Sequence, residues 1–337
     1  MRTTLPVIME KYAITQDFPF YIALVIPKIS KDELYNLEKR ASIKKMQLSL
    51  RKEKEDLYYF KAKLIKRTAH GYLLTKSDKI WFFIGRSDAI DVFDKIIKNL
   101  YPLIAFPIIY VTDFIEILNE YAKYYDITVI QLVLRKRLAK ETTKKWLKRD
   151  YKEVIDEIIK IIRKEHTVLD SMRLLIKSKY TYESMEVNIM RKGLLTVYTG
   201  TSHLFVDLEN LVIEKFITKA IKEREKLREV KRYIDKKTGE TRAKIASITF
   251  PNKISSADFT KFIEILSRTH YLSIYRKGNP YLYLVAIDKS NGSSYEIFAT
   301  SKMARIIPRT KTEVDSLYLI LEAFSEITLL SKIDFEE

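Results

Sequence analysis

The sequence predicts an α+β protein, of mixed α/β character, that folds into two lobes. Several runs of β-branched and aromatic residues have the length of strands, and turn residues separate them. Between these runs lie charge-rich segments whose apolar residues recur at helical spacing. Hydrophobic residues make up 47% of the 337 residues, which is enough for a buried core. We therefore expect antiparallel or mixed sheets with helices in both lobes.

The first lobe is expected to span residues 1–165. Residues 18–26 (FPFYIALVI) are predicted to form a buried strand, and residues 31–55 a charged helix that Ser30 caps. Residues 57–84 contain three strand-like pieces separated by turn residues, which predicts an antiparallel meander.

Three further helices are predicted in the first lobe. Two of them run from Ser87 to Leu100 and from Thr112 to Tyr124, because Ser and Thr favour N-cap positions. A strand is predicted at residues 127–134 (ITVIQLVL). Residues 141–165 repeat apolar residues at helical spacing, so a long basic amphipathic helix is expected to end the lobe.

The second lobe is expected to span residues 166–337. Its predicted helices begin at Asp207, continuing toward Tyr233, and at Ser256, and a terminal helix covers residues 312–330. A hairpin tip is predicted at residues 237–240. Strands are predicted at residues 172–176, 185–190, 194–198, 243–250, 272–275, 281–288 and 295–300.

The charge balance indicates an acidic partner. Lysine and arginine outnumber aspartate and glutamate 61 to 44, which gives a formal net charge of +17 and a pI near 9.5. Such a surface attracts polyanions or acidic proteins. Few glycines and no cysteine, with abundant lysine, glutamate and isoleucine, resemble the composition of proteins from thermophiles.

Composition also bears on the compartment and on redox chemistry. The absence of cysteine excludes disulfides, thiolate zinc sites and cysteine nucleophiles. The first residues lack the apolar core of a signal peptide, and we expect a cytoplasmic protein. The most apolar run, residues 101–111, contains Pro102 and Pro107 and is too short to cross a membrane.

The sequence offers little that indicates catalysis. None of the four histidines has a partner at metal-ligand spacing, and phosphate-binding glycine loops and nucleophile-elbow motifs are lacking. We therefore expect no metal, no cofactor and no enzymatic activity. Asp207 and Glu209, in HLFVDLEN, are the best acidic pair. They could hold a divalent metal in a nuclease, or they could cap a helix and complement its dipole.

Two clusters of basic residues predict contact with nucleic acid. Residues 135–152 carry nine lysines and arginines with Trp146 among them, and residues 39–54 carry seven. Such surfaces neutralise phosphates, and aromatic rings stack on unpaired bases. The residues expected to contact nucleic acid are Lys44, Lys45, Arg51, Lys52, Arg135, Arg137, Lys144, Lys145, Trp146, Lys148, Arg149, Lys236, Lys237, Arg276 and Lys277.

Two other charged segments give weaker indications of a binding surface. Residues 215–237 carry ten basic residues but also four acidic ones, so they could form an ordinary solvated helix face. Residues 313–337 carry seven acidic residues and one lysine, which suits a solvated terminal helix or a surface for a basic partner. Trp146 could alternatively face the core together with Val154 and Ile158.

Turn chemistry is concentrated late in the chain. Asn291 and Gly292 tolerate positive φ, so they predict a hairpin between the strands at 281–288 and 295–300. Arg276 to Pro280 would form a tight entry to the first of these strands, because proline restricts the preceding residue to extended geometry.

This stretch resembles the C-terminal part of the APAZ region, the module that accompanies short prokaryotic Argonautes. The similarity covers residues 276–301 (RKGNPYLYLVAIDKSNGSSYEIFATS) and 305–310 (RIIPRT). Three ordered elements carry it, at Asn279–Leu284, Asp288–Ser294 and Ile306–Pro308. The motif and structural residues are Asn279, Pro280, Tyr281, Asp288, Gly292, Ser293 and Ser294.

The resemblance implies a non-catalytic subunit that heterodimerises with a short Argonaute containing MID and PIWI domains. Its second lobe would be similar to the N and linker domains of long Argonautes, and the pair would hold a guide strand and its nucleic-acid target, RNA or DNA, in antiviral or anti-plasmid defence of an archaeal cell. Since no effector signature is visible in the sequence, any effector would be a separate protein. The alternatives are a metal-dependent nuclease that uses Asp207 and Glu209, and a stand-alone, sequence-independent nucleic-acid-binding protein of defence or viral origin.

Overall fold

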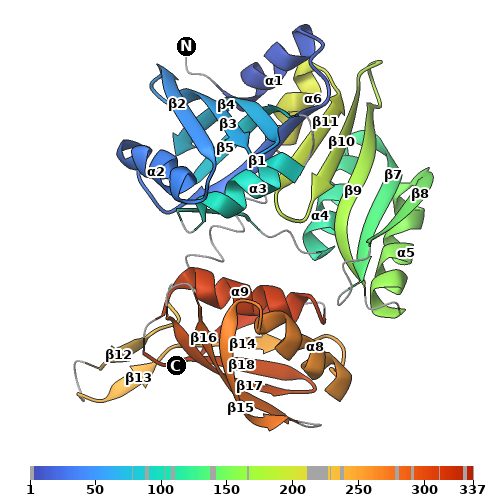
Figure 1. Ribbon diagram of the computed structural model, residues 1–337. Helices are drawn as coiled ribbons and strands as arrows, with labels where there is room; N and C mark the ends of the chain where they lie inside the picture. The colour runs from blue at the N-terminus through green and yellow to red at the C-terminus, as the bar shows by residue number, and fades with distance from the viewer. Residues whose placement is uncertain are drawn as a thin grey trace. The chain divides into compact units, whose positions relative to one another are not determined.

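The chain folds into two compact units, the first built mainly from residues 1–220 and the second mainly from residues 221–337 (Figure 1). Both units combine helices with antiparallel sheet, which confirms the predicted α+β class. Among the described residues no helix is long and apolar enough to cross a membrane. The computed structural model describes residues 4–77, 79–87, 91–101, 103–107, 111–136, 142–164, 167–210, 227, 229–235, 239–277, 281–289, 292–310, 312–328 and 332–336.

One large sheet organises the first unit, with 11 strands among the described residues. The predicted meander is confirmed, because three strands that follow each other in the chain are neighbours in the sheet. The short strand β6 (Ile104–Ala105) pairs with β1 beside the main path. In order across the sheet the strands are β2 (Gln47–Lys54), β3 (Leu57–Leu64), β4 (Arg67–Ser77), β5 (Ile80–Ser87), β1 (Phe20–Pro27), β11 (Leu194–Thr199), β10 (Ser184–Met190), β9 (Thr167–Ser178), β7 (Tyr125–Lys136) and β8 (Thr142–Asp150).

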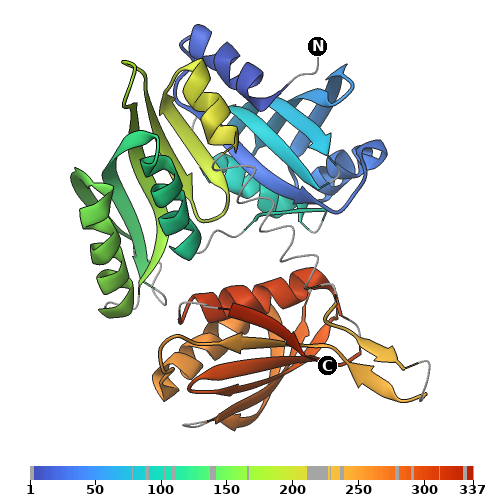
Figure 2. The same cartoon turned by 180° about the vertical axis from the view of Figure 1, so that it is seen from behind.

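Helices cover both faces of this sheet. Ala23 and Val25 of β1 pack with α2 (Tyr35–Ile43) and α3 (Asp91–Leu100). A short 3-10 turn at Lys31–Glu33 precedes α2. Phe20 lies on the opposite face of β1, since side chains alternate along a strand. Its ring stacks on α1 (Leu5–Ile14) and meets α6 (Ser202–Asp207), and α4 (Val111–Ala122) lies on this same side (Figure 2).

Two charged segments predicted as helix contain strands. The helix expected at residues 31–55 ends with α2 at Ile43, and β2 follows it. The helix expected at residues 141–165 is α5 (Tyr151–Lys164) only, preceded by β8. Both strands pair along one edge with an apolar neighbour, β3 or β7, and this pairing outweighs the helical propensity of lysine and glutamate. The helices expected near residues 87–100 and 112–124 are α3 and α4, but Ser87 ends β5 and does not cap α3.

The first unit extends past the boundary expected at residue 165. Strands β9, β10 and β11 continue the first sheet, because β11 pairs antiparallel with β1. Strand β1 is almost entirely buried and needs a hydrogen-bonding neighbour on each edge. It finds β5 on one side and β11, about 170 residues later in the chain, on the other.

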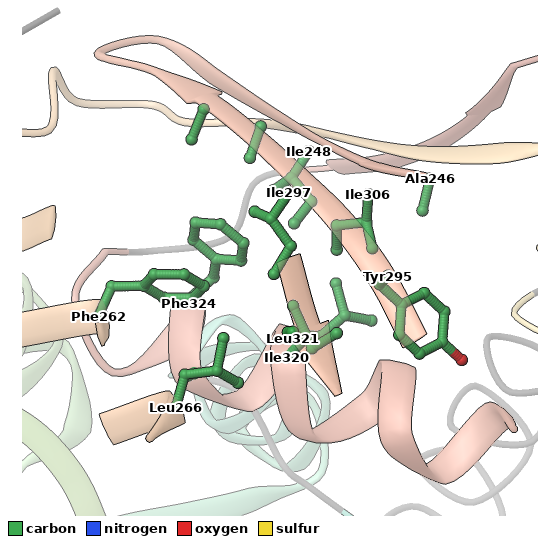
Figure 3. Packing of buried hydrophobic residues seen from close by; sticks show 14 of the residues in the cluster. Ala246, Ile248, Phe262, Leu266, Tyr295, Ile297, Ile306, Ile320, Leu321 and Phe324 are labelled. Carbon is green, nitrogen blue, oxygen red and sulfur yellow. The ribbon is translucent and has the colours of Figure 1, made fainter. Parts of the chain in front are cut away.

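A 6-stranded antiparallel sheet with helices on one face forms the second unit (Figure 3). Helices α8 (Ser256–Leu266) and α9 (Val314–Ser325) pack against it, and the rings of Phe262 and Phe324 stack with centroids 4.1 Å apart. Beside it, β12 (Arg232–Ile234) and β13 (Thr241–Ala243) pair where the hairpin tip was predicted. The order of the sheet is β15 (His270–Lys277), β16 (Tyr281–Asp288), β17 (Ser294–Thr300), β18 (Met303–Pro308), β14 (Ile245–Thr249) and β19 (Lys332–Glu336).

The C-terminal part departs from a single terminal helix. Helix α9 ends at Ser325, and β19 follows it and pairs with β14. Strands β16 and β17 pair antiparallel, which confirms the predicted hairpin, and Gly292 has the positive φ that such a turn requires, +75°. Asn291 lies outside the described residues.

Candidate nucleic-acid interface

Strand β8 forms one edge of the large sheet and carries the densest group of predicted contact residues. It pairs with β7 alone, so its outer edge is free of a strand neighbour within the described residues. Lys144 and Trp146 lie two residues apart and therefore on the same face, opposite Val133 and Gln131. Trp146 is 61% exposed. The alternative in which Trp146 joins Val154 and Ile158 in the core is wrong, since both of those residues are fully buried on α5.

A bulge interrupts the pairing near the end of β8. Leu147 and Lys148 together oppose Ile130, and Lys148 has a φ of +50°. Lys144, Lys148 and Arg149 are exposed, and Lys145 is half-buried. The Arg149 guanidinium forms an ion pair with Glu157 at 3.3 Å, so its charge is partly neutralised. Lys144 and Lys148 are the more open cations of this strand.

Arg135 lies beside β8, but its guanidinium is near a carboxylate of the same unit. It ends the pairing of β7 with β8 opposite Thr142, and its Nε lies 3.7 Å from a carboxylate oxygen of Asp170. We therefore expect Arg135 to contribute less to anion binding than Lys144 or Lys148.

The second basic cluster lies at the opposite edge of the same sheet. Lys44 and Lys45 follow α2, and Lys45 has a φ of +57° where the chain turns into β2. Arg51 and Lys52 are exposed on β2. Arg51 forms an ion pair with Glu53 at 2.6 Å and lies over the ring of Tyr59.

Eight strands separate β2 from β8, so the two basic clusters do not form one continuous patch. At the ordinary spacing between strands they are about 40 Å apart along the sheet. Each cluster can therefore contact a different part of a long polyanion, or only one of them contacts it.

Sequence reasoning missed one arginine of this unit. Arg173 alternates with the buried Met172 and Leu174 and so lies on the other face of β9. Its guanidinium sits 3.8 Å from the ring centroid of Tyr198 and also contacts Glu186. The signal in the sequence was the single cation within the apolar run SMRLLI.

In the second unit, Arg276 and Lys277 are exposed at the end of β15. The Arg276 guanidinium lies 5.5 Å from the centroid of the Tyr281 ring. Five predicted residues lie outside the described residues, namely Arg137, Lys236, Lys237, Asn279 and Pro280.

Most of the remaining motif residues are buried and hydrogen-bonded at the turn between β16 and β17. Asp288, Ser293 and Ser294 are buried, and the backbone of Asp288 donates to Ser293 and accepts from Gly292. The Ser294 hydroxyl lies 2.9 Å from that of Thr310. Tyr281 is the exception, with 39% of its surface exposed.

A buried histidine lies next to this turn. His270 is opposite Asp288 in the β15–β16 pairing, and its ring nitrogens lie 3.1 Å from the Ser316 hydroxyl and 2.8 Å from that of Thr269. Burial lowers the pKa of His270, and the nearby Lys289 acts in the same direction, against the charge of Asp288. With Ser316 fully buried, this group is a packed polar cluster.

The acidic pair at residues 207 and 209 does not lie at the start of a helix. Asp207 is the last residue of α6, so the capping alternative is wrong. Its carboxylate accepts a hydrogen bond from the Tyr125 hydroxyl; burial, and then this bond, raise the pKa of Tyr125. Glu209 is buried. Within the described part of the chain, no three histidine, aspartate or glutamate side chains are placed to hold a metal ion.

Comparison with protein-family models gives no match for this chain, and comparison with curated proteins gives none either.

Proposed function

We propose that the protein is a non-catalytic, nucleic-acid-binding subunit that heterodimerises with a short Argonaute and helps to hold a guide strand and its target. In this proposal it acts in the cytoplasm of an archaeal cell, in antiviral or anti-plasmid defence. The effector of the system is a separate protein.

The observation that carries the nucleic-acid part is the composition of β8. An edge strand offers the exposed lysines Lys144 and Lys148, with the exposed indole of Trp146 between them in sequence. Lysines bind phosphates without regard to sequence, and an indole stacks on any base. A guide–target pair must be held in the same sequence-independent way.

The Argonaute part rests on the APAZ-like motif. Its elements occupy β16, the turn after it, β17 and β18, which form one continuous antiparallel sheet. The buried Asp288 and Ser294 stabilise that turn, so the motif supports a rigid module. We propose that this second unit corresponds to the N and linker domains of long Argonautes.

Co-expression with a short Argonaute encoded beside the gene tests the proposal. We expect a stable heterodimer after affinity capture of either chain and gel filtration in about 0.5 M salt, with short nucleic acid released from it on extraction. An unrelated basic protein of similar pI serves as the capture control. Recovery of this chain alone, free of the Argonaute, would contradict the proposal.

A cleavage assay distinguishes the proposed binding subunit from a metal-dependent nuclease. Labelled RNA and DNA are incubated with the protein and Mg²⁺ or Mn²⁺, and the wild type is compared with Asp207→Asn. The proposal predicts no cleavage by either. Cleavage by the wild type that the variant loses would support the metal-dependent nuclease. Nucleic-acid binding with a steep salt dependence but no heterodimer would instead support the stand-alone protein.

A further inference from the structure

The sheet of the second unit has one face that the described helices leave open. Leu282, Leu284 and Ala286 of β16 point to α8 and α9 and are fully buried. The alternate residues of the same strand, Tyr281 and Tyr283 among them, point to the other face. The packing in Figure 3 lies on the helical side only.

Aromatic rings gather on this open face. Tyr275 and Tyr283 stack with centroids 5.2 Å apart, and Tyr281 and Phe298 stack at 5.9 Å, each pair with rings tilted by 28°. Tyr275 is 64% exposed and Phe298 is 38% exposed. A contiguous exposed apolar patch on a soluble protein often marks an interaction site.

The aromatic residues lie within a row that ends in cations. Strand pairing places Arg276 opposite Tyr283, Tyr283 opposite Phe298, and Phe298 opposite Arg305. The row therefore crosses four neighbouring strands with a guanidinium at each end. Arg276 also lies over the ring of Tyr281.

Two carboxylates on this face have arginine partners. Glu296 lies 3.3 Å from Arg309, and Glu336 lies 3.0 Å from Arg305. Lys277 is paired with Leu282 and therefore lies on the other face, so Arg276 is the exposed cation that β15 adds here. The face therefore combines open aromatic surface with positive charge at its margins, which suits a ligand that has both flat rings and phosphates.

We propose that the open face of β15–β18 binds the unpaired nucleotides of a single strand, with bases stacked on the Tyr275–Tyr283 and Tyr281–Phe298 pairs and the backbone held by Arg276. This inference deepens the proposed function and rests on it for the source of the strand. It assigns a contact with bases to the second unit, in addition to the contacts proposed for β8 of the first unit. Single-stranded RNA and DNA share this chemistry, and the experiment includes both.

The test measures binding of the full chain to labelled dT20, U20 and an abasic strand of equal length. Tyr283→Ala with Phe298→Ala is expected to weaken binding of dT20 and U20 about tenfold or more. Binding of the abasic strand, which has phosphates but no bases, should change less than about twofold. Tyr283→Leu with Phe298→Leu keeps apolar surface but removes the rings, and it should weaken binding as much as the alanine pair.

Two exposed tyrosines of the first unit provide the matched control. Tyr180 and Tyr182 lie in the β9–β10 turn and are 89% and 109% exposed. Their alanine variants should bind all three strands as the wild type does. A conservative pair, Tyr283→Phe with Phe298→Tyr, keeps a ring at both positions. It should bind the base-containing strands as the wild type does.

The outcomes separate this inference from the proposed function. If the wild type binds the strands but the aromatic variants bind them equally well, the inference is overturned and the nucleic-acid role of β8 stands. If the aromatic variants keep strand affinity but lose the Argonaute, the face is a protein interface and the inference is overturned. If the wild type binds no nucleic acid, both the inference and the proposed function fail.

Discussion

Phe20 of β1 lies directly opposite Val197 of β11, in the middle of the large sheet. Its ring also stacks on Tyr12 at 5.2 Å and meets Phe205 at 6.2 Å. Phe20 is fully buried. One side chain thus joins α1, α6 and strands far apart in the sequence, and it ties residues up to about 205 to the first unit.

Truncation of this side chain should destabilise the first unit. Phe20→Ala is expected to lower its free energy of unfolding by about 3–5 kcal/mol, because it leaves a cavity among packed aromatic rings. Urea unfolding followed by tryptophan fluorescence measures this directly, since Trp81 and Trp146, the two tryptophans of the chain, both lie in the first unit. Tyr180→Ala, at an exposed site, is the control. A change below about 1 kcal/mol for Phe20→Ala would contradict this packing.

Two glycines should differ in their tolerance of alanine. A Cβ atom at Gly85 would lie 2.1 Å from the backbone oxygen of His70, so β4 and β5 would have to separate. We expect Gly85→Ala to cost about 2–3 kcal/mol. A Cβ atom at Gly292 meets nothing within 4 Å, and only its φ of +75° opposes substitution, at about 1 kcal/mol. Thermal unfolding of the two variants gives the comparison, and equal losses would count against the β4–β5 approach.

The buried His270 should make the second unit sensitive to mild acid. Burial lowers its pKa in the folded chain, whereas the unfolded chain keeps the ordinary value of about 6.5. The unfolded state therefore binds more protons, and the free energy of unfolding should fall as the pH drops from about 7 to about 5. Circular dichroism of urea unfolding at several pH values follows this loss.

A variant isolates the contribution of that histidine. His270→Gln is expected to flatten the dependence on pH while lowering stability at neutral pH, because the bonds to Thr269 and Ser316 are altered. His203→Gln, at an exposed position of α6, should keep the wild-type dependence. An unchanged pH dependence in His270→Gln would show that other groups titrate.

Local sequence patterns predicted the elements whose partners lie nearby in the chain. The meander at β3–β5, the capped helix α8 and the hairpin at Gly292 all follow from turn residues and apolar spacing, and all are present. The Ser255 cap is completed by the Asp258 carboxylate, which accepts from the Ser255 backbone.

Pairing between strands that are far apart in the sequence could not be predicted from local patterns. No local signal shows that β1 will pair with β11, or that residues 332–336 return to pair with β14. Strands β2 and β8 were missed because lysine and glutamate favour helix, whereas their strand conformation depends on the neighbours β3 and β7.

For the candidate interface, sequence alone identified the charges but not their arrangement. It found the lysines of β8 and Trp146, yet it could not show that the two basic clusters occupy opposite sheet edges. The sequence contains Tyr275, Tyr283 and Phe298, but the strand register was needed to show that their rings lie on one face.

The role of β8 is measured most directly by the salt dependence of nucleic-acid binding after charge reversal on this strand. Lys144→Glu with Lys148→Glu is compared with Lys66→Glu and Lys253→Glu, two exposed lysines elsewhere that give the same change in net charge. For several duplexes of unrelated sequence, the β8 variant should bind more weakly by a similar factor each time, and the slope of log K against log salt should shrink by about 2. The control variant should keep the wild-type slope. Equal losses in both variants, or losses that depend on sequence, would contradict a backbone contact at β8.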